Sequence, residues 1–199
     1  MYDGNNPTAL HSRKWLADAL LSLMEERSYS KVTVKDICKK ADLSRQTFYN
    51  FFECKDDIIR FCIHQCYAEM MTGLAQKTPV KLDGITRQLT ETLYRNQRLM
   101  CLIVLHGLDY LLEAEMASVI QVFAEQMSPG PAGELDQYAA AFLSGAISHM
   151  VLHWFRSEKP VSQEQLSGLL YRILAGNYFQ IQNEYLVKIN NGYQKTDPI

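Results

Sequence analysis

Residues 33–55 constrain the fold of this chain more than any other stretch, because they predict two short helices joined by a tight turn. Thr33 and Ser44 belong to the side chains that cap helix N-termini, and each precedes apolar residues at helical spacing. Asp42 and Leu43 break the periodicity between the two runs. Two helices joined by a turn of about three residues can present the second helix to the major groove of DNA.

The predicted outer side of the second helix carries side chains that suit DNA, namely Arg45, Gln46, Thr47, Tyr49 and Asn50. Arginine binds guanine through O6 and N7, glutamine binds adenine, and the threonine methyl group packs on thymine. Tyr49, Lys55 and the Ser44 hydroxyl suit phosphate oxygens, which position a protein on DNA without reading its sequence. The alternative for the same stretch is a helical hairpin within a bundle that binds no DNA.

The segment TVKDICKKADLSRQTFYNFFECKDDI, residues 33–58, resembles the DNA-binding signature of the TetR/AcrR family of bacterial transcription regulators. The shared features are the opening Thr, a buried Ile and Ala, the Leu-Ser turn, the aromatic-Tyr-x-x-Phe run and the Lys of the next helix. Asp42 stands where the family often has Gly, and Asp tolerates the left-handed conformation better than most residues. The resemblance, which covers roughly residues 8–64, implies base contacts from Lys35, Arg45, Gln46 and Thr47 and phosphate contacts from Thr33, Ser44, Tyr49 and Lys55.

The distribution of charge agrees weakly with a DNA-binding segment. The chain of 199 residues has a formal net charge of -2, which by itself would not suggest DNA. Residues 31–55 hold six basic and three acidic side chains, a local balance of +3, so the remainder carries -5. A basic patch on an acidic body is typical of a DNA-reading domain on a regulatory one, although a solvated helix face has the same composition.

The five cysteines favour a reducing compartment. Their number is odd, and we find neither a secretory signal nor an apolar run long enough to cross a membrane, so we expect a cytoplasmic protein, on the nucleoid when bound to DNA. Cys62 and Cys66 share a helix face near His64, which leaves redox or metal sensing open. Buried thiols that act as small hydrophobes are the alternative.

The whole sequence predicts an all-α fold of about nine helices in two domains. Residues 8–54 form a three-helix DNA-binding head, residues 55–187 an effector-binding and dimerisation body, and residues 188–199 a tail. A long helix over 55–76 spans head and body and is expected to carry any signal between them. Further helices are expected over 82–96, 99–112, 113–127, 134–156 and 162–187, with a loop at 128–133.

The last two helices suit a homodimer interface, because small residues beside large ones allow close helix crossing. The expected interface residues are Phe142, Gly145, Ala146, His153, Leu166, Leu170, Ile173 and Leu174. The periodicity fits a monomer core equally well, whereas the family resemblance implies pairing. Two heads about 34–36 Å apart would fit an inverted-repeat operator in double-stranded DNA.

Polar residues among the apolar helices of the body are candidates for an effector pocket. They are Tyr67, Cys101, His106, Tyr110, His149 and Trp154. Each has the alternative of a satisfied core or interface side chain. The effector is an unknown small molecule, and no cofactor, metal site or catalytic residue is predicted.

Three functions are consistent with these patterns. The first is a DNA-binding repressor that a small molecule releases from a palindromic operator. The second is a co-activator or co-regulator of the same family that acts through a protein partner. The third is a small helical enzyme or ligand carrier, although the sequence contains no phosphate-binding Gly-rich loop, nucleophile elbow or zinc motif.

Overall fold

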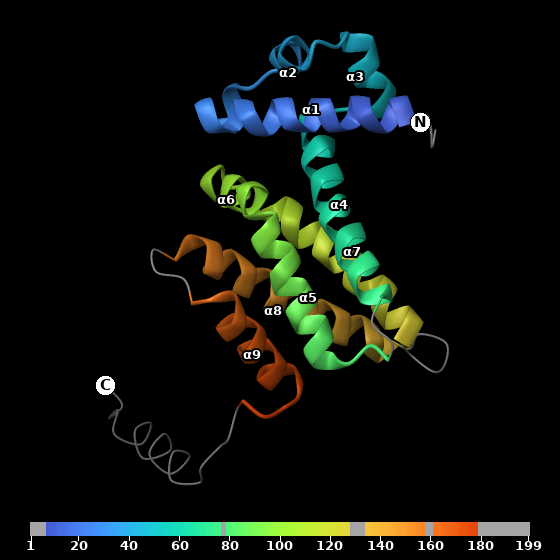
Figure 1. Ribbon diagram of the computed structural model, residues 1–199, viewed down its shortest axis with the longest axis vertical. Helices are drawn as coiled ribbons and strands as arrows, with labels where there is room; N and C mark the ends of the chain where they lie inside the picture. The colour runs from blue at the N-terminus through green and yellow to red at the C-terminus, as the bar shows by residue number, and fades with distance from the viewer. Residues whose placement is uncertain (1–6, 77–78, 128–133, 158–160, 179–199) are drawn as a thin grey trace, which may run out of the picture.

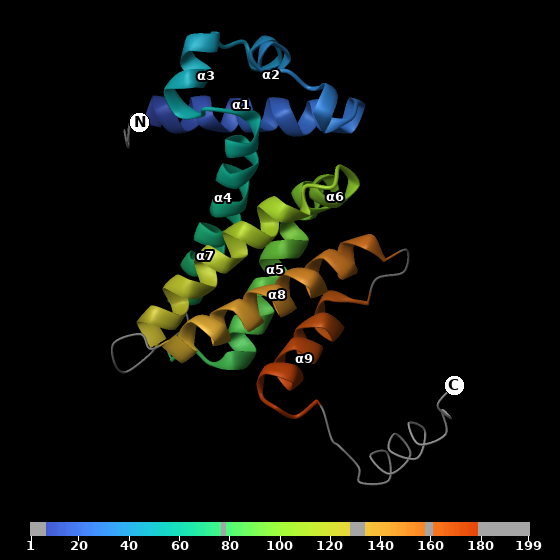
Figure 2. The same cartoon turned by 180° about the vertical axis from the view of Figure 1, so that it is seen from behind.

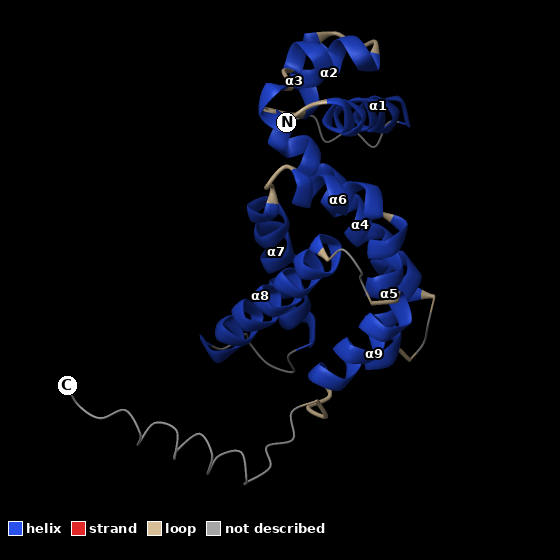
Figure 3. Ribbon diagram, turned by 90° about the vertical axis from the view of Figure 1, so that its left-hand side faces the viewer, coloured by secondary structure: helices blue, strands red, loops and turns tan. Residues whose placement is uncertain are grey.

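The protein is all-helical in the part that the computed structural model describes, residues 7–76, 79–127, 134–157 and 161–178. These residues contain nine α-helices, one short 3-10 helix and no strand (Figure 3). The predicted fold class is therefore confirmed. Residues 179–199, which include the predicted tail, lie outside the described residues.

The head consists of α1 (Pro7–Glu26), the 3-10 helix η1 (Tyr29–Lys31), α2 (Val34–Ala41) and α3 (Arg45–Phe51). Helices α2 and α3 lie on one side of α1, at the upper end of the molecule (Figure 1). The side chains of Leu16, Ile37 and Phe48 are fully buried between these helices. Burying large apolar side chains from all three helices stabilises the head as a unit.

The body consists of α4 to α9, and α4 connects it to the head (Figure 1). The bounds are α4 (Lys55–Ala75), α5 (Leu82–Arg95), α6 (Gln97–Leu105), α7 (Asp109–Met127), α8 (Glu134–Arg156) and α9 (Gln163–Leu174). Helix α4 packs on α5 and α7, α7 packs on α8, and α9 packs on α5. Figure 2 shows α7 and α8 on the face turned toward the viewer. One apolar core continues from α1 in the head to α8 in the body.

Two predicted helix boundaries are wrong, and glycine explains both. The expected break after residue 112 instead falls at residues 106–108, where Gly107 has a φ of +65°. The Leu108 N–H donates to the Ile103 carbonyl at 2.9 Å across it, so α6 ends in a Schellman motif. Helix α9 ends at Leu174 rather than near residue 187, because Gly176 adopts a φ of +74° in a second such motif.

Candidate DNA-binding surface and effector cavity

Helix α2 begins with a reciprocal capping box, as its sequence predicts. The Thr33 hydroxyl accepts the Asp36 N–H at 3.2 Å, and the Asp36 carboxylate accepts the Thr33 N–H at 3.0 Å. Hydrogen bonds from Thr33 and the nearby Arg27 guanidinium, 3.2 Å away, lower the pKa of Asp36. The first turn of α2, which carries Lys35, is therefore held in place.

The turn between α2 and α3 is set by one left-handed residue. Asp42 has a φ of +53°, and across it the Leu43 N–H donates to the Cys38 carbonyl at 3.0 Å. Ser44 then caps α3 by accepting the Thr47 N–H at 3.0 Å. The carboxylate side chain thus does not prevent Asp42 from adopting the conformation that a glycine would adopt here.

Helix α3 is anchored through its aromatic face. Phe48 is fully buried, its ring centroid lies 5.9 Å from that of Phe52, and Phe52 lies 5.8 Å from Phe61 of α4. Aromatic contacts of this kind favour specific orientations. The opposite face of α3 therefore carries Arg45, Gln46 and Asn50 into solvent in a fixed orientation.

The cations of the head divide into two groups. Arg27 and Lys40 form ion pairs with Asp36 and Glu26. By contrast, five exposed cations have neither an ion pair nor a hydrogen bond within the described chain: Lys14, Lys31, Lys35, Lys39 and Arg45. Unpaired surface cations are available to neutralise phosphates.

Lys55 lies in an unexpected environment for a phosphate ligand. Its ammonium group donates to the carbonyls of Tyr29 at 2.6 Å and Val32 at 3.0 Å, and it lies 4.1 Å from the Tyr29 ring centroid. Loss of solvation lowers the pKa of Lys55. Since an ammonium has three donors, one N–H is left for a phosphate. Lys55 thus holds η1 against α4, and its phosphate contact stays a prediction.

The remaining predicted contact residues lie on the same two helices or at their caps. Thr33, Ser44 and Tyr49 are exposed, and Thr47 is half-buried, with its hydroxyl 2.8 Å from that of Ser44. Tyr49 packs its ring edge against Phe48, with centroids 5.2 Å apart, which restrains its phenol. Asn50, which we noted as polar but did not assign to a base or a phosphate, is also exposed.

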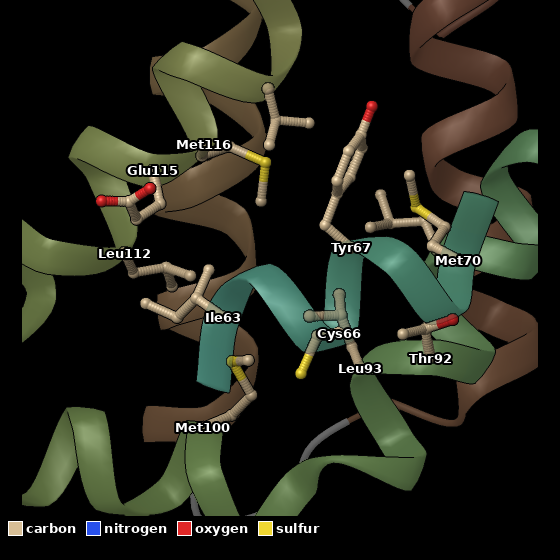
Figure 4. Close-up of a pocket in the computed structure, with 12 residues that line it drawn as sticks. Ile63, Cys66, Tyr67, Met70, Thr92, Leu93, Met100, Leu112, Glu115 and Met116 are labelled. Atoms are coloured by element: carbon tan, nitrogen blue, oxygen red, sulfur yellow. The ribbon is translucent and has the colours of Figure 1, made fainter. Parts of the chain in front are cut away.

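The body contains a cavity of about 60 Å³ between α4, α5, α6 and α7 (Figure 4). Its lining is almost entirely apolar: Ile63, Cys66, Tyr67, Met70, Leu89, Thr92, Leu93, Met100, Leu112, Glu115, Met116 and Val119. Ligand sites typically occupy roughly 300–1,000 Å³. This cavity is therefore smaller than a typical ligand site.

Of the six residues predicted for an effector pocket, only Tyr67 lines the cavity. Cys101 and His149 are exposed, and the Trp154 indole donates to the Val161 carbonyl at 2.9 Å. His106 and Tyr110 instead connect the body with the region of the head. Apart from Thr92 and Glu115, the other lining residues are apolar and helically spaced, so their sequence pattern is that of any core.

The junction between head and body is a set of polar contacts around η1. Asp56 accepts hydrogen bonds from the hydroxyls of Tyr29 at 2.6 Å and Tyr110 at 2.8 Å. His106 Nδ1 accepts the Tyr29 N–H at 3.4 Å, and its Nε2 lies 2.8 Å from the Met24 carbonyl. Burial, followed by the hydrogen bond to Asp56, strongly raises the pKa of Tyr29. Helix α4 therefore contacts this short segment of the head directly, and α7 is linked to it through Asp56.

A buried carboxylate forms the polar edge of the cavity. Glu115 of α7 accepts from Arg60 Nη1 at 2.6 Å and lies 2.7 Å from His64 Nε2, and both partners belong to α4. Sequence analysis did not find this cluster, because Glu115 and Arg60 are 55 residues apart. Only the packing of α4 on α7 brings them together.

The five cysteines differ in burial: Cys38 and Cys66 are buried, Cys62 is half-buried, and Cys54 and Cys101 are exposed. All five are free, and burial raises the pKa values of Cys62 and Cys66 to about 12, which keeps both thiols protonated. In the part of the chain that the structure describes, no three His, Cys, Asp or Glu side chains could hold one metal ion. Likewise, none of its helices is long and apolar enough to span a membrane.

Helix α8 exposes a stripe of residues one turn apart, here called the α8 stripe: Tyr138, Phe142, Gly145, Ala146, His149 and His153. Tyr138 is 68% exposed and Phe142 73% exposed. A Cβ atom added to Gly145 would meet nothing within 4 Å, so the stripe is open there. Of the α9 residues predicted for an interface, Ile173 is exposed and Leu174 half-buried, but Leu166 and Leu170 are buried within their own chain.

Comparison with known proteins agrees with this architecture. Residues 16–60 match a family model described as bacterial regulatory proteins, tetR family. A transcriptional activator of the dhaKLM operon, DhaS from Lactococcus lactis, is 30% identical over 67 residues, which are 34% of this chain and 36% of that protein. The match thus spans about a third of the length of that relative.

Solved structures extend the likeness to the whole fold. Lin0861 from Listeria innocua superposes with a TM-score of 0.73 at 16% identity, over 88% of this chain and 95% of that one. FadR from Thermus thermophilus, a repressor solved in complex with lauroyl-CoA, has a TM-score of 0.51 at 19% identity, over 85% and 96%. The head has the helix-turn-helix arrangement and matches the model of a family of bacterial regulatory proteins. The likeness to the tetR family in sequence is thus carried by residues 16–60, and the body shares the fold of these solved structures.

Proposed function

We propose that this regulator binds an inverted-repeat operator as a homodimer and that a small molecule in its body cavity changes its affinity for DNA. The observation that carries the proposal is the outward face of α3. Its polar side chains stand on a helix that is capped by Ser44 and anchored by Phe48, beside cations without partners. Such preorganisation suits the reading of base edges.

The proposed contacts follow from the placement of each side chain. Exposed Arg45, Gln46 and Lys35, with the methyl group of Thr47, are assigned to bases. Thr33, Ser44, Tyr49 and the third N–H of Lys55 are assigned to phosphates. Ser44 and Thr33 lie at helix N-termini, where free amides and the helix dipole also favour an anion.

Dimerisation is supported by the exposure of the α8 stripe. Large aromatic side chains such as Phe142 and Tyr138 in one continuous stripe are unusual on a monomer surface and typical of an interface. We propose that two copies of α8 and the exposed side of α9, including Ile173, meet across a two-fold axis. Leu166 and Leu170 support α9 from within the chain.

The proposed signal runs along α4. A ligand in the cavity would lie between Ile63 of α4 and Leu112 of α7, and Asp56 of α4 accepts hydrogen bonds both from Tyr29 of η1 and from Tyr110 of α7. A shift of α4 against α7 would therefore tilt the head. The ligand acts only to the extent that it binds one head spacing more tightly than the other.

We propose repression as the outcome of DNA binding, because a protein on a palindromic operator blocks access to the DNA that it covers. A second candidate is an activator or co-regulator that works with a protein partner. The relative at 30% identity is named a transcriptional activator, which favours this candidate. Transcription from a promoter that carries the selected operator, with and without the protein, distinguishes the two.

Selection from a random duplex pool tests the proposal. Purified protein is incubated with the pool at two salt concentrations, and bound DNA is sequenced. We expect enrichment of an inverted repeat with half-sites about one helical turn apart, and weaker recovery at high salt. A double variant, Arg45→Ala with Gln46→Ala, is the control and should enrich no repeat. Failure of the wild-type protein to enrich any sequence would contradict the proposal.

A further inference from the structure

The walls of the body cavity contain several flexible side chains. Three of its lining residues are methionines, Met70, Met100 and Met116, and Cys66 adds a fourth sulfur. Methionine is unbranched and polarisable, so it adapts to ligands of different shape. The cavity measures about 60 Å³, whereas a cavity that binds benzene measures roughly 150 Å³. Its walls would therefore have to move apart even for a ligand of that size, which favours a compact ligand over a large one.

One lining residue has an unused hydrogen-bonding group. Thr92 is 2% exposed, and its hydroxyl has no hydrogen-bond partner among the described residues. Thr90, two residues earlier on the same helix, is equally buried, but its hydroxyl donates to the carbonyls of Thr86 and Arg87. An unpaired buried hydroxyl is unfavourable. Rotation about χ1 exchanges the positions of the hydroxyl and methyl groups, so Thr92 can turn its hydroxyl toward a guest.

The charges at the cavity do not suit an ionised ligand. Figure 4 shows the Glu115 carboxylate at one edge, on the opposite side of the cavity from Met70. It already pairs with Arg60 and His64, so the guanidinium and the imidazole are both engaged. The lining contains no Lys, Arg or His. An anion in the cavity would therefore be buried without a counter-charge, and a cation would have to compete with Arg60.

We propose that the cavity takes a compact, uncharged and mainly apolar molecule with one hydrogen-bonding group, which pairs with the Thr92 hydroxyl. This inference rests on the proposed function only for the effect of the ligand on DNA binding. The binding itself concerns Thr92, Tyr67 and the three methionines.

Four small aromatic probes test the chemical class. Toluene, benzyl alcohol, benzoate and benzylammonium share one ring and differ in polarity and charge. Each is titrated into the full chain labelled with ¹³C at the methionine methyl groups. We expect benzyl alcohol to shift the signals of Met70, Met100 and Met116 saturably, with a Kd at least tenfold below that of either ion and severalfold below that of toluene.

Two matched variants isolate the hydroxyl. Thr92→Val keeps the shape of the side chain and should reduce the affinity for benzyl alcohol to that for toluene. Thr90→Val, in which a satisfied hydroxyl outside the cavity is lost, should leave the preference unchanged. Equal or tighter binding of benzoate or benzylammonium would overturn the inference, as would a preference for benzyl alcohol that survives Thr92→Val.

The two proposals fail separately. If the duplex pool yields an operator but none of the four probes shifts the cavity methionines, the proposed ligand class is wrong and DNA binding stands. If benzyl alcohol binds as described but no operator is enriched, the inference stands and the regulatory function fails.

Discussion

The head and the body are both helical, but they place their polar side chains differently. In the head, α3 is capped by Ser44 and anchored by Phe48, and its polar side chains face outward. In the body, the polar groups lie at the edges of a cavity whose walls include flexible methionines. The difference fits the two proposed roles, because reading DNA favours a fixed backbone, whereas binding a small molecule in so small a cavity would need walls that adjust.

The 3-10 helix η1, which lies at the junction of head and body, shares features of both regions. Tyr29 of η1 is buried and hydrogen-bonded like a core residue, but its partners come from α4 and from the loop after α6. Asp56 of α4 accepts one hydrogen bond from Tyr29 and another from Tyr110 of α7. A movement of α4 relative to α7 would therefore strain or break one of these two hydrogen bonds. The comparison therefore predicts that changes in the head act on DNA binding directly, whereas changes in the body act through this junction or through dimerisation.

The largest effect is expected when the body can no longer pair two heads. Phe142→Asp places a charge on the α8 stripe and should give a monomer whose operator affinity is lower by a factor of about 10² or more, since the second head no longer binds in the same complex. Analytical ultracentrifugation and fluorescence anisotropy measure the two effects. Leu105 is 71% exposed on α6, outside the stripe, so Leu105→Asp is the matched control and should remain dimeric.

A smaller loss is expected at the reading face of the head. Arg45→Ala should reduce the preference for the operator over unrelated DNA by about 1–3 kcal/mol if the guanidinium binds a base. Lys39→Ala, an exposed and unpaired cation on α2, should weaken both kinds of DNA alike and make the salt dependence shallower. Anisotropy titrations with the two duplexes measure both ratios. An unchanged preference in Arg45→Ala would remove this residue from the base contacts.

Removing equivalent helix caps from the two regions should reduce stability equally but should affect operator affinity only in the head. Ser44 caps α3 and Ser162 caps α9, and each accepts an N–H at the third helical position. Replacing either by Ala should cost about 1 kcal/mol of unfolding free energy. Only Ser44→Ala should also weaken operator binding, because it removes a proposed phosphate contact and loosens the cap of α3. Chemical denaturation combined with anisotropy checks this, and equal DNA affinities would show that the rigidity of α3 is unimportant.

The smallest effect concerns the thiols. At pH 8 a thiol reagent should modify exposed Cys54 and Cys101, while Cys62 and Cys66 remain protected, because burial raises their pKa values to about 12. Since unfolded thiols ionise near 9, these two groups contribute stability that is present below pH 9 and declines as the pH rises toward 12. Mass spectrometry of the modified protein and unfolding curves between pH 8 and pH 10 measure both. Rapid modification of Cys62 at pH 8 would reopen redox sensing.

The features predicted correctly from sequence depend on local chemistry. Thr33 and Ser44 cap their helices, and Asp42 takes the left-handed turn, because each interaction involves residues three to five positions apart. The apolar periodicity likewise indicated all nine helices, although it placed the end of α6 and that of α9 wrongly. Those helices end in Schellman motifs at Gly107 and Gly176, and such a motif cannot be recognised from the pattern of apolar residues.

The features that were missed depend on contacts between distant segments. The lining of the cavity could not be predicted, because it is mainly apolar, whereas the residues predicted for an effector pocket were His, Tyr, Trp and Cys; of these, Tyr67 lines the cavity and His106 and Tyr110 lie at the junction. The ammonium of Lys55 is held by carbonyls 23 and 26 residues away. Leu166 and Leu170 have the same periodicity as exposed interface residues, and only the packing of α9 on α5 shows that they are buried.

The most direct test of the central claim is the affinity of the intact protein for its selected operator across a range of salt concentrations, with the binding stoichiometry measured in the same titration. Two heads that neutralise phosphates on one inverted repeat predict two chains per duplex and a log–log slope steeper than about -3, since each neutralised phosphate contributes roughly -0.9. A slope near zero, or a single chain per duplex, would contradict the account.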